Sequence, residues 1–87
     1  MKKLHQFPIF LKYPHHKTFF RITDANTFDQ LDIIGTGYHL QHFTATVYPD
    51  KLLILDMMEN QNGYWLESSE QEWNEQWAYC QENLPAI

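Results

Sequence analysis

Five histidines are the residues of this chain whose chemistry most readily suggests a metal site, and their spacing tests that idea. His39 and His42 fall in a segment expected to be extended. Side chains alternate between faces there, so residues three apart point to opposite sides. His15 and His16 are adjacent in an expected turn and would supply at most one or two ligands. We therefore predict polar surface and turn histidines, with no metal site and no other cofactor.

Asp56 is the acid with the most interesting context, because it interrupts the apolar run of residues 52–58. An ionised carboxylate is costly to bury without a partner, so solvent or a basic neighbour is the simplest expectation. A perturbed catalytic carboxylate is the other possibility, since buried acids can be functional. This keeps one alternative open: a small-molecule or metal-binding accessory protein, or a weak enzyme, that uses Asp56 with His42 and the His15-His16 turn.

Nucleophilic residues give less support to catalysis. Cys80 is the single cysteine, and it shares a helical stripe with Trp73, where a buried thiol is usually inert. Ser68 and Ser69 are explained by helix capping. Residues 35–37 (Gly-Thr-Gly) lack the third glycine and the lysine of phosphate-binding loops. The sequence carries no enzyme signature, and we predict no catalytic residue.

The first half of the chain must position these groups on a strand and a helix. Pro8 and Pro14 bracket a segment that we expect to be extended and confined to an edge or an irregular path. Residues 17–22 alternate in a way that favours a strand. A capping box at residues 27–30 then predicts a short helix, with Leu31 on its apolar face and Gly35 as its left-handed stop.

A β-hairpin is predicted next. Residues 38–48 are rich in β-branched and aromatic side chains, and Pro49 and Asp50 suit a tight turn. Residues 51–58 would form the second arm. A two-residue loop would pair Val47 with Leu52.

The last third of the chain predicts a brief strand and an amphipathic helix. Residues 64–67 follow a strong turn signal and are read as the strand. Residues 69–72 form a second capping box, after which Trp73, Trp77, Cys80 and Leu84 recur at helical spacing. Pro85 ends this helix.

These elements predict an α+β fold. We expect a small two-layer domain with a mostly antiparallel sheet, in the order strand, helix, hairpin, short strand, helix, and with both helices packed on one face. A chain of 87 residues has room for one core, so residues 1–87 are read as a single domain. Residues 1–16 form a basic, aromatic-rich extended segment that we expect to pack on the body.

Charge and hydropathy narrow the class of protein. Residues 1–22 carry a net charge of +5 and residues 23–87 carry −10, which favours docking of the basic segment on the acidic body. Basic and aromatic residues alternate within residues 12–21, but the net charge of −5 argues against nucleic-acid binding. No apolar run is long enough for a membrane span, no signal peptide is evident, and a lone cysteine suits a reducing cytoplasm.

Surplus apolar surface is the one functional signal. Both faces of the expected 51–58 strand are apolar, although a sheet with one wet face should alternate. The second face needs cover from the N-terminal segment, a second copy of the chain or a partner protein. The leading hypothesis is a cytoplasmic, non-enzymatic protein-interaction module that can form a homodimer or accept a partner strand. Its predicted partner-binding residues are Leu53, Leu55, Met57, Tyr64, Trp65 and Tyr79.

Overall fold

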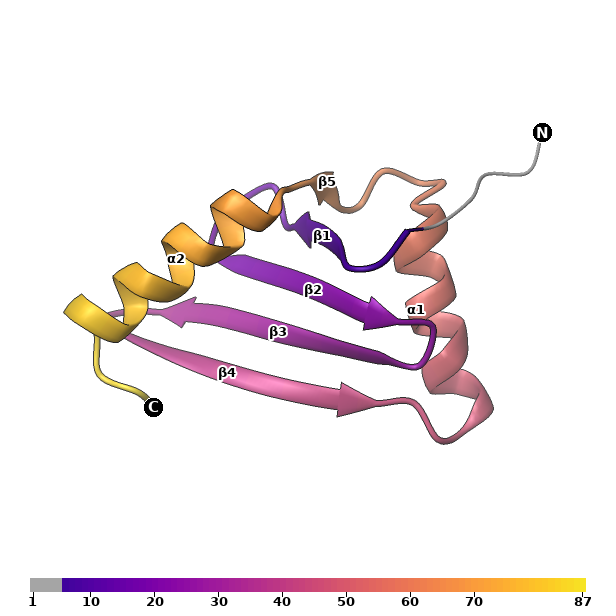
Figure 1. Cartoon of the computed structure of the whole chain (residues 1–87), viewed down its shortest axis with the longest axis horizontal. Helices are drawn as coiled ribbons and strands as arrows, with labels where there is room; N and C mark the ends of the chain where they lie inside the picture. Colours follow the sequence, from indigo (N-terminus) through magenta and orange to yellow (C-terminus); the bar gives the residue numbers. More distant parts are fainter. Residues whose placement is uncertain (1–5) are drawn as a thin grey trace.

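The computed structural model describes residues 6–87, which form a five-stranded sheet and two helices (Figure 1). The sheet order is β4-β3-β2-β1-β5, and every neighbouring pair is antiparallel. The predicted α+β class with an antiparallel sheet is confirmed. In chain order the elements are β1 (Ile9–Lys12), β2 (Thr18–Asp24), β3 (Thr27–Ile34), β4 (Gly37–Thr44), α1 (Tyr48–Glu59), β5 (Leu66–Glu67) and α2 (Glu70–Asn83).

The predicted helix over residues 27–34 is wrong, because this segment is β3. It lies between β2 and β4 and pairs with both along its length, so tertiary pairing satisfies its backbone on two sides. Thr27, the predicted helix cap, instead forms a contact in the β2–β3 turn. The Thr27 hydroxyl meets that of Thr23 across the tight β2–β3 connection, where Asp24 accepts a hydrogen bond from the Asn26 N–H at 2.7 Å.

The predicted hairpin is also wrong. Residues 38–48 do contain a strand, β4, but its partner is β3, with Phe43 opposite Phe28. Residues 51–58 lie in α1 and form no second arm, so the pairing of Val47 with Leu52 does not occur. Pro49 lies in the first turn of this helix, where its fixed φ fits the helical backbone and its missing N–H costs nothing. The leucines that follow are good helix formers.

The remaining predicted elements are confirmed with small changes in their bounds. β2, β5 and α2 occur where the pattern placed them, and the segment between the two prolines contains β1. Ser69 caps α2 by accepting the N–H of Glu72 at 3.1 Å. The Glu72 carboxylate does not complete the capping box. It accepts hydrogen bonds from Lys12 Nζ at 2.8 Å and from Ser68 instead.

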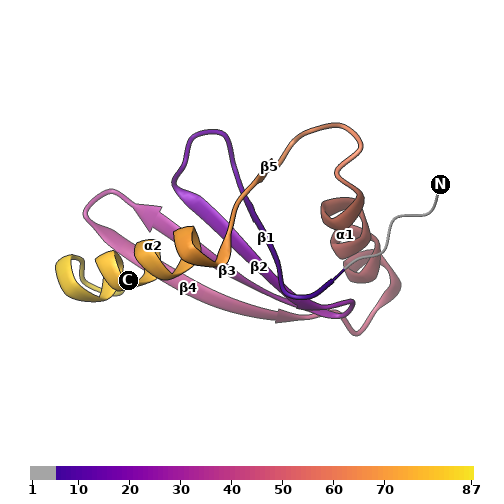
Figure 2. The same ribbon diagram turned by 45° about the horizontal axis from the view of Figure 1, so that its top comes forward.

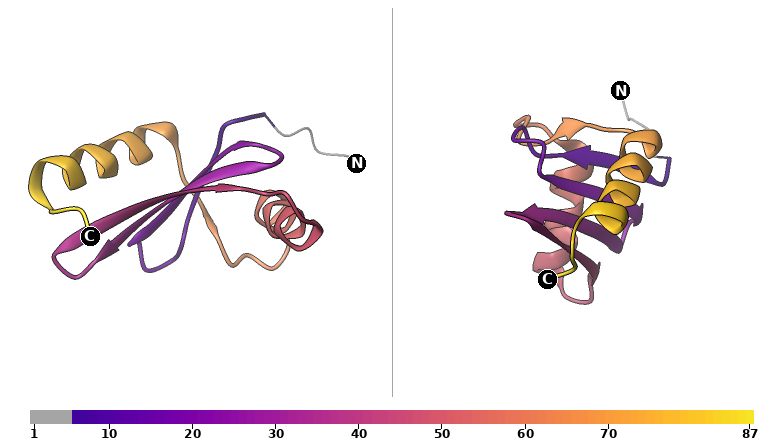
Figure 3. Two further views of the ribbon diagram at one scale, coloured as in Figure 1. Left: turned by 90° about the horizontal axis from the view of Figure 1, so that it is seen from below. Right: turned by 90° about the vertical axis from the view of Figure 1, so that its left-hand side faces the viewer.

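The two helices lie on opposite faces of the sheet, so the prediction of both on one face is wrong. Adjacent residues of β2 explain this arrangement: Phe20 packs in a cluster with Ile54 and Met57 of α1, whereas Phe19 packs with Trp73 of α2. The left panel of Figure 3 shows α2 on one side of the twisted sheet and α1 on the other. Figure 2 shows them near opposite ends of it.

The N-terminal segment enters the fold through β1, which lies between β2 and β5. Of the segment 1–16, residues 1–5 lie outside the described residues. Lys12 forms its ion pair with Glu72 of α2, and Leu11 joins the core that faces α1. Over residues 6–87, neither helix has the length and apolarity needed to cross a membrane.

The helical phase of α1 predicts which of its residues stabilise the fold. Ile54→Ala should lower the free energy of unfolding by about 2–5 kcal/mol, because Ile54 is 1% exposed and its loss leaves a cavity. Leu55→Ala should change it by less than about 1 kcal/mol, because the Leu55 side chain lies at the surface. Urea unfolding of both variants measures the difference. Equal losses would contradict this helical phase.

Candidate functional site

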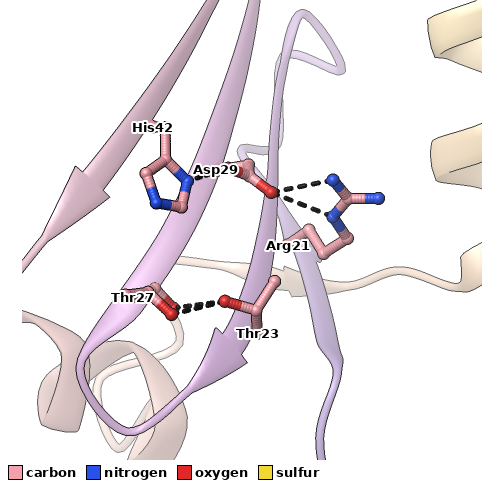
Figure 4. A network of polar contacts seen from close by, with 5 residues as sticks. All are labelled: Arg21, Thr23, Thr27, Asp29 and His42. Atoms are coloured by element: carbon pink, nitrogen blue, oxygen red, sulfur yellow. Dashed lines mark hydrogen bonds and ion pairs between the residues drawn. The ribbon is translucent and has the colours of Figure 1, made fainter.

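Each face of the sheet is apolar where a helix covers it and polar where none does. On the face that carries α2, the uncovered end holds a row of three side chains in register across β2, β3 and β4: Arg21, Asp29 and His42. Asp29 Oδ2 accepts hydrogen bonds from Arg21 Nη2 at 2.8 Å and from Arg21 Nε at 3.1 Å. Asp29 Oδ1 lies 2.6 Å from His42 Nδ1 (Figure 4).

Asp29 is the buried centre of this row, with a side chain only 10% exposed. Burial by itself raises the pKa of Asp29, but hydrogen bonds from His42 and Arg21 outweigh it, and the pKa lies below its ordinary value. Arg21 is further fixed because its guanidinium lies 4.9 Å from the ring centre of Trp73 on α2. The carboxylate is therefore held ionised between two strands.

A second carboxylate holds the opposite face together in the same way. On the side of α1, Asp32 accepts hydrogen bonds from Thr18 at 2.9 Å and from Gln30 at 3.1 Å. Gln41 on β4 approaches the same carboxylate at 3.5 Å. Asp29 and Asp32 each bond side chains of the neighbouring strands β2 and β4, so both belong to the structure of the sheet.

The histidines and Asp56 are not brought together. His42 bonds Asp29 on the face opposite α1, and His15 accepts the Lys17 N–H at 3.0 Å in the β1–β2 turn. Asp56 is exposed on α1 and lines a hollow of about 150 Å³ with Glu59, Gln61, Asn62, Tyr64 and Trp65. No group of three potential metal ligands occurs within residues 6–87.

The predicted partner-binding residues are distributed over two helices and a loop. Leu53, Leu55 and Tyr64 are exposed near α1, but Met57 is only 1% exposed and belongs to the core. The shared strand face assigned to Leu53, Leu55 and Met57 does not exist, because the segment is helical.

The other two predicted residues differ in position. Trp65 is partly buried against the α1 core, and its ring meets that of Tyr64 edge to face at 6.0 Å. Tyr79 is exposed on α2, on the opposite face of the sheet from α1.

The structure adds two residues that the strand assignment missed. Tyr48 and Leu52 are 72% and 41% exposed, and Leu55 is 42% exposed, so these three residues form an apolar stripe at i, i+4 and i+7. The buried residues Ile54 and Met57 lie on the other side of the helix. The outer face of α1 is defined here as Tyr48, Leu52 and Leu55. The sequence pattern that could have predicted this face is Pro49 in the first turn of a helix, together with apolar residues at i, i+4 and i+7.

Charged residues border the outer face of α1, and Lys51 lies on one flank, four residues before Leu55. Asp56 follows Leu52 by four residues and Glu59 follows Leu55 by four, so each acid lies one helical turn beyond a stripe leucine. The last turn of α1 carries no basic residue. Beyond Asp56 around the helix, Leu53 lines an apolar groove of about 190 Å³ between α1 and the β3–β4 pair, next to Phe43.

No family model, no curated protein and no solved structure matches this chain.

The Asp29 row predicts a pH-dependent stability. A carboxylate with a lowered pKa contributes stability above its unfolded pKa of about 3.9 and loses it as the pH falls through the folded value. Asp29→Asn should therefore lower the free energy of unfolding at pH 7 by about 1–3 kcal/mol. The difference from the unmodified chain should shrink below about pH 4. Urea unfolding across this range measures it.

Asp56→Asn is the control for this experiment, because Asp56 is exposed on α1. This variant should have the same free energy of unfolding as the unmodified chain at pH 7 and at pH 3. A loss in Asp29→Asn that is the same at pH 7 and at pH 3 would contradict the assigned role of the ionised carboxylate.

Proposed function

We propose that this chain is a small cytoplasmic, non-enzymatic interaction module that binds a partner protein through the outer face of α1. The observation that carries the proposal is that α1 is apolar on both sides. Ile54 and Met57 fill the core, and Leu52 and Leu55 lie on the opposite side of the same helix. A surface helix normally keeps its large apolar residues on the side that faces the core, so the two leucines on the opposite side are surplus apolar surface.

Covering this face would bury further apolar area. Fully burying a leucine contributes about 1.5–3 kcal/mol, so covering the 41% of Leu52 and 42% of Leu55 that are exposed would add roughly 1 kcal/mol each, besides the contribution of Tyr48. Tyrosine is also enriched in the centres of interfaces, where the ring packs and the hydroxyl keeps a hydrogen bond. These residues lie on a regular helix, so their spacing is set before the partner arrives.

The acidic border favours a particular kind of partner. Asp56 and Glu59 lie at the C-terminal end of the outer face, where the last turn of α1 carries no basic residue to balance them. A partner segment with apolar side chains flanked by lysine or arginine matches both features. Binding of a helix into a groove of the partner is the corresponding recognition mode.

A cytoplasmic location is supported by the cysteine chemistry. Cys80 is a free buried thiol, and burial raises its pKa, which keeps it protonated and unreactive. A single protected thiol suits a reducing compartment. The alternative, a ligand site that joins Asp56 to His42, receives no such support, because His42 is already bonded to Asp29.

Aspartate substitutions on the outer face of α1 test the proposal. Leu52→Asp and Leu55→Asp should each weaken capture of the partner from native cell extract by tenfold or more, since interface anchors contribute about 1.4 kcal/mol or more. Quantitative mass spectrometry of the captured proteins measures the loss. Tyr79→Asp on α2 is the matched control and should retain the same proteins. If no captured protein depends on Leu52 or Leu55, the proposal is wrong.

Reversing the acidic border tests the chemistry of the partner. The double variant Asp56→Lys with Glu59→Lys should reduce capture of the same proteins, and added salt should weaken capture by the unmodified chain. Both substitutions are at exposed positions, so thermal unfolding should change little. Unchanged capture after charge reversal would show that the partner is not recognised through basic residues.

A further inference from the structure

The outer edge of β4 carries a second interaction surface, which does not involve the outer face of α1. β4 is the last strand of the sheet order, and Figure 1 shows it along one margin of the molecule. Within residues 6–87, the outer edge of β4 is covered only at Tyr38, near the start of the strand. Tyr38 donates its N–H to Pro85 O at 3.0 Å and accepts the Ile87 N–H at 2.8 Å, in a parallel bridge centred on Ala86.

The C-terminal residues are fitted closely against this part of the edge. A Cβ at Gly37 would lie 2.7 Å from Cγ1 of Ile87, so glycine makes room for the tail. The tail therefore blocks the edge at Tyr38 and leaves the stretch from residue 40 to residue 44 open.

Backbone alternation identifies the free groups on this open stretch. The N–H and C=O of Tyr38 point outward, because they bond the C-terminal tail. Residues of the same parity, Leu40, His42 and Thr44, therefore point their N–H and C=O groups outward too. Ala45 has the other parity, and its N–H bonds Asn26 O on the inner side at 2.6 Å.

This edge lacks the features that normally prevent strand pairing. β4 contains no lysine, arginine, acid or proline, whereas natural edges use charge, proline or short length to avoid association. Two of its large apolar side chains, Leu40 and Phe43, are exposed. β5 at the other margin of the sheet is only two residues long. Over residues 6–87, the sheet is thus protected at the β5 edge and open along residues 40–44 of β4.

We propose that a second copy of this chain pairs with β4 through its own β4, antiparallel about a two-fold axis at His42. The open stretch runs from Leu40 to Thr44, and His42 is its midpoint. In this register Leu40 lies opposite Thr44 of the partner subunit, and every outward N–H and C=O of the three residues is paired. A register shifted by two residues one way would place Thr44 against Tyr38, where the tail already lies, and shifted the other way would place Leu40 against Thr46, beyond the end of β4.

The side chains of the edge are compatible with this self-pairing. β4 is uncharged apart from its histidines, so no acids or lysines face each other across the axis. Phe43, which stacks on Phe28 at 4.7 Å, would lie opposite Gln41 of the partner subunit. On the other face, the Arg21, Asp29 and His42 row would continue into its symmetry copy.

Self-complementarity is the reason for choosing a second copy over an unrelated peptide. An unrelated strand would use the same backbone groups, whereas a second copy brings the same open stretch of Leu40, His42 and Thr44, bounded by the same C-terminal residues. Two copies of the open stretch satisfy each other completely. Strand addition of this kind gains main-chain hydrogen bonds and merges the two sheets into one.

Disulfide trapping tests the axis directly. In His42→Cys, the two introduced cysteines would lie opposite each other at a Cα separation of about 5.5 Å, within reach of a disulfide. Mild oxidation should give a covalent dimer on non-reducing gels. Leu40→Cys is the matched control: it would be offset from its own copy by four residues, about 13 Å along the strand, and should stay monomeric. Equal trapping of both variants, or of neither, would overturn the proposal.

The mass in solution provides the second measurement. Sedimentation of the unmodified chain should approach twice 10.5 kDa as the concentration rises. Thr44→Pro removes an outward N–H without removing a bond to β3, and it should shift the chain to the monomer. Leu55→Asp should leave the dimer intact, because α1 takes no part in it. If the chain stays monomeric at several hundred micromolar, the proposed dimer is wrong. The proposal is also wrong if β4 binds a strand of another protein in place of a second copy.

Discussion

Two consecutive phenylalanines in β2 set the constraint that the rest of the structure obeys. Phe19 and Phe20 are both buried, and the pleat of a strand sends neighbouring side chains to opposite faces. Both faces of the sheet therefore need apolar cover. A single helix lies on one face only, so α1 covers Phe20 and α2 covers Phe19. The placement of the two helices on opposite faces follows from this pair of residues.

The polar rows follow from the same constraint. Each helix covers only one end of its face, so each face has a second end that remains open to solvent. Asp29 and Asp32 occupy these open ends on opposite faces, and each accepts hydrogen bonds from neighbouring strands. Their charges are satisfied by partners in the sheet. For this reason Asp29, Asp32 and His42 contribute to the stability of the sheet.

The two surfaces proposed for interaction have different physical origins. The outer face of α1 is a surplus of side chains, because Leu52 and Leu55 are apolar on a helix that has already filled its core with Ile54 and Met57. The edge of β4 is a surplus of backbone, because among residues 6–87 no strand lies beside the outward groups of Leu40, His42 and Thr44. The outer face of α1 selects a partner by shape and charge, and the edge of β4 selects one by hydrogen-bond register. Because the two surfaces lie on different elements, both can be occupied together.

The sequence by itself determined the α+β class, the strand of β2, the short strand β5 and the helix α2, because each depends on local signals such as capping by Ser69. Only the tertiary structure decided the state of residues 27–34 and 51–58. Phe28 and Leu31 fit a helix by spacing, yet pairing with strands on both sides makes the segment β3. The leucines of residues 51–58 fit either state, and the strand beside β4 was already supplied by β3. Local pattern records which residues are apolar, whereas the choice of partner strand depends on residues distant in the chain.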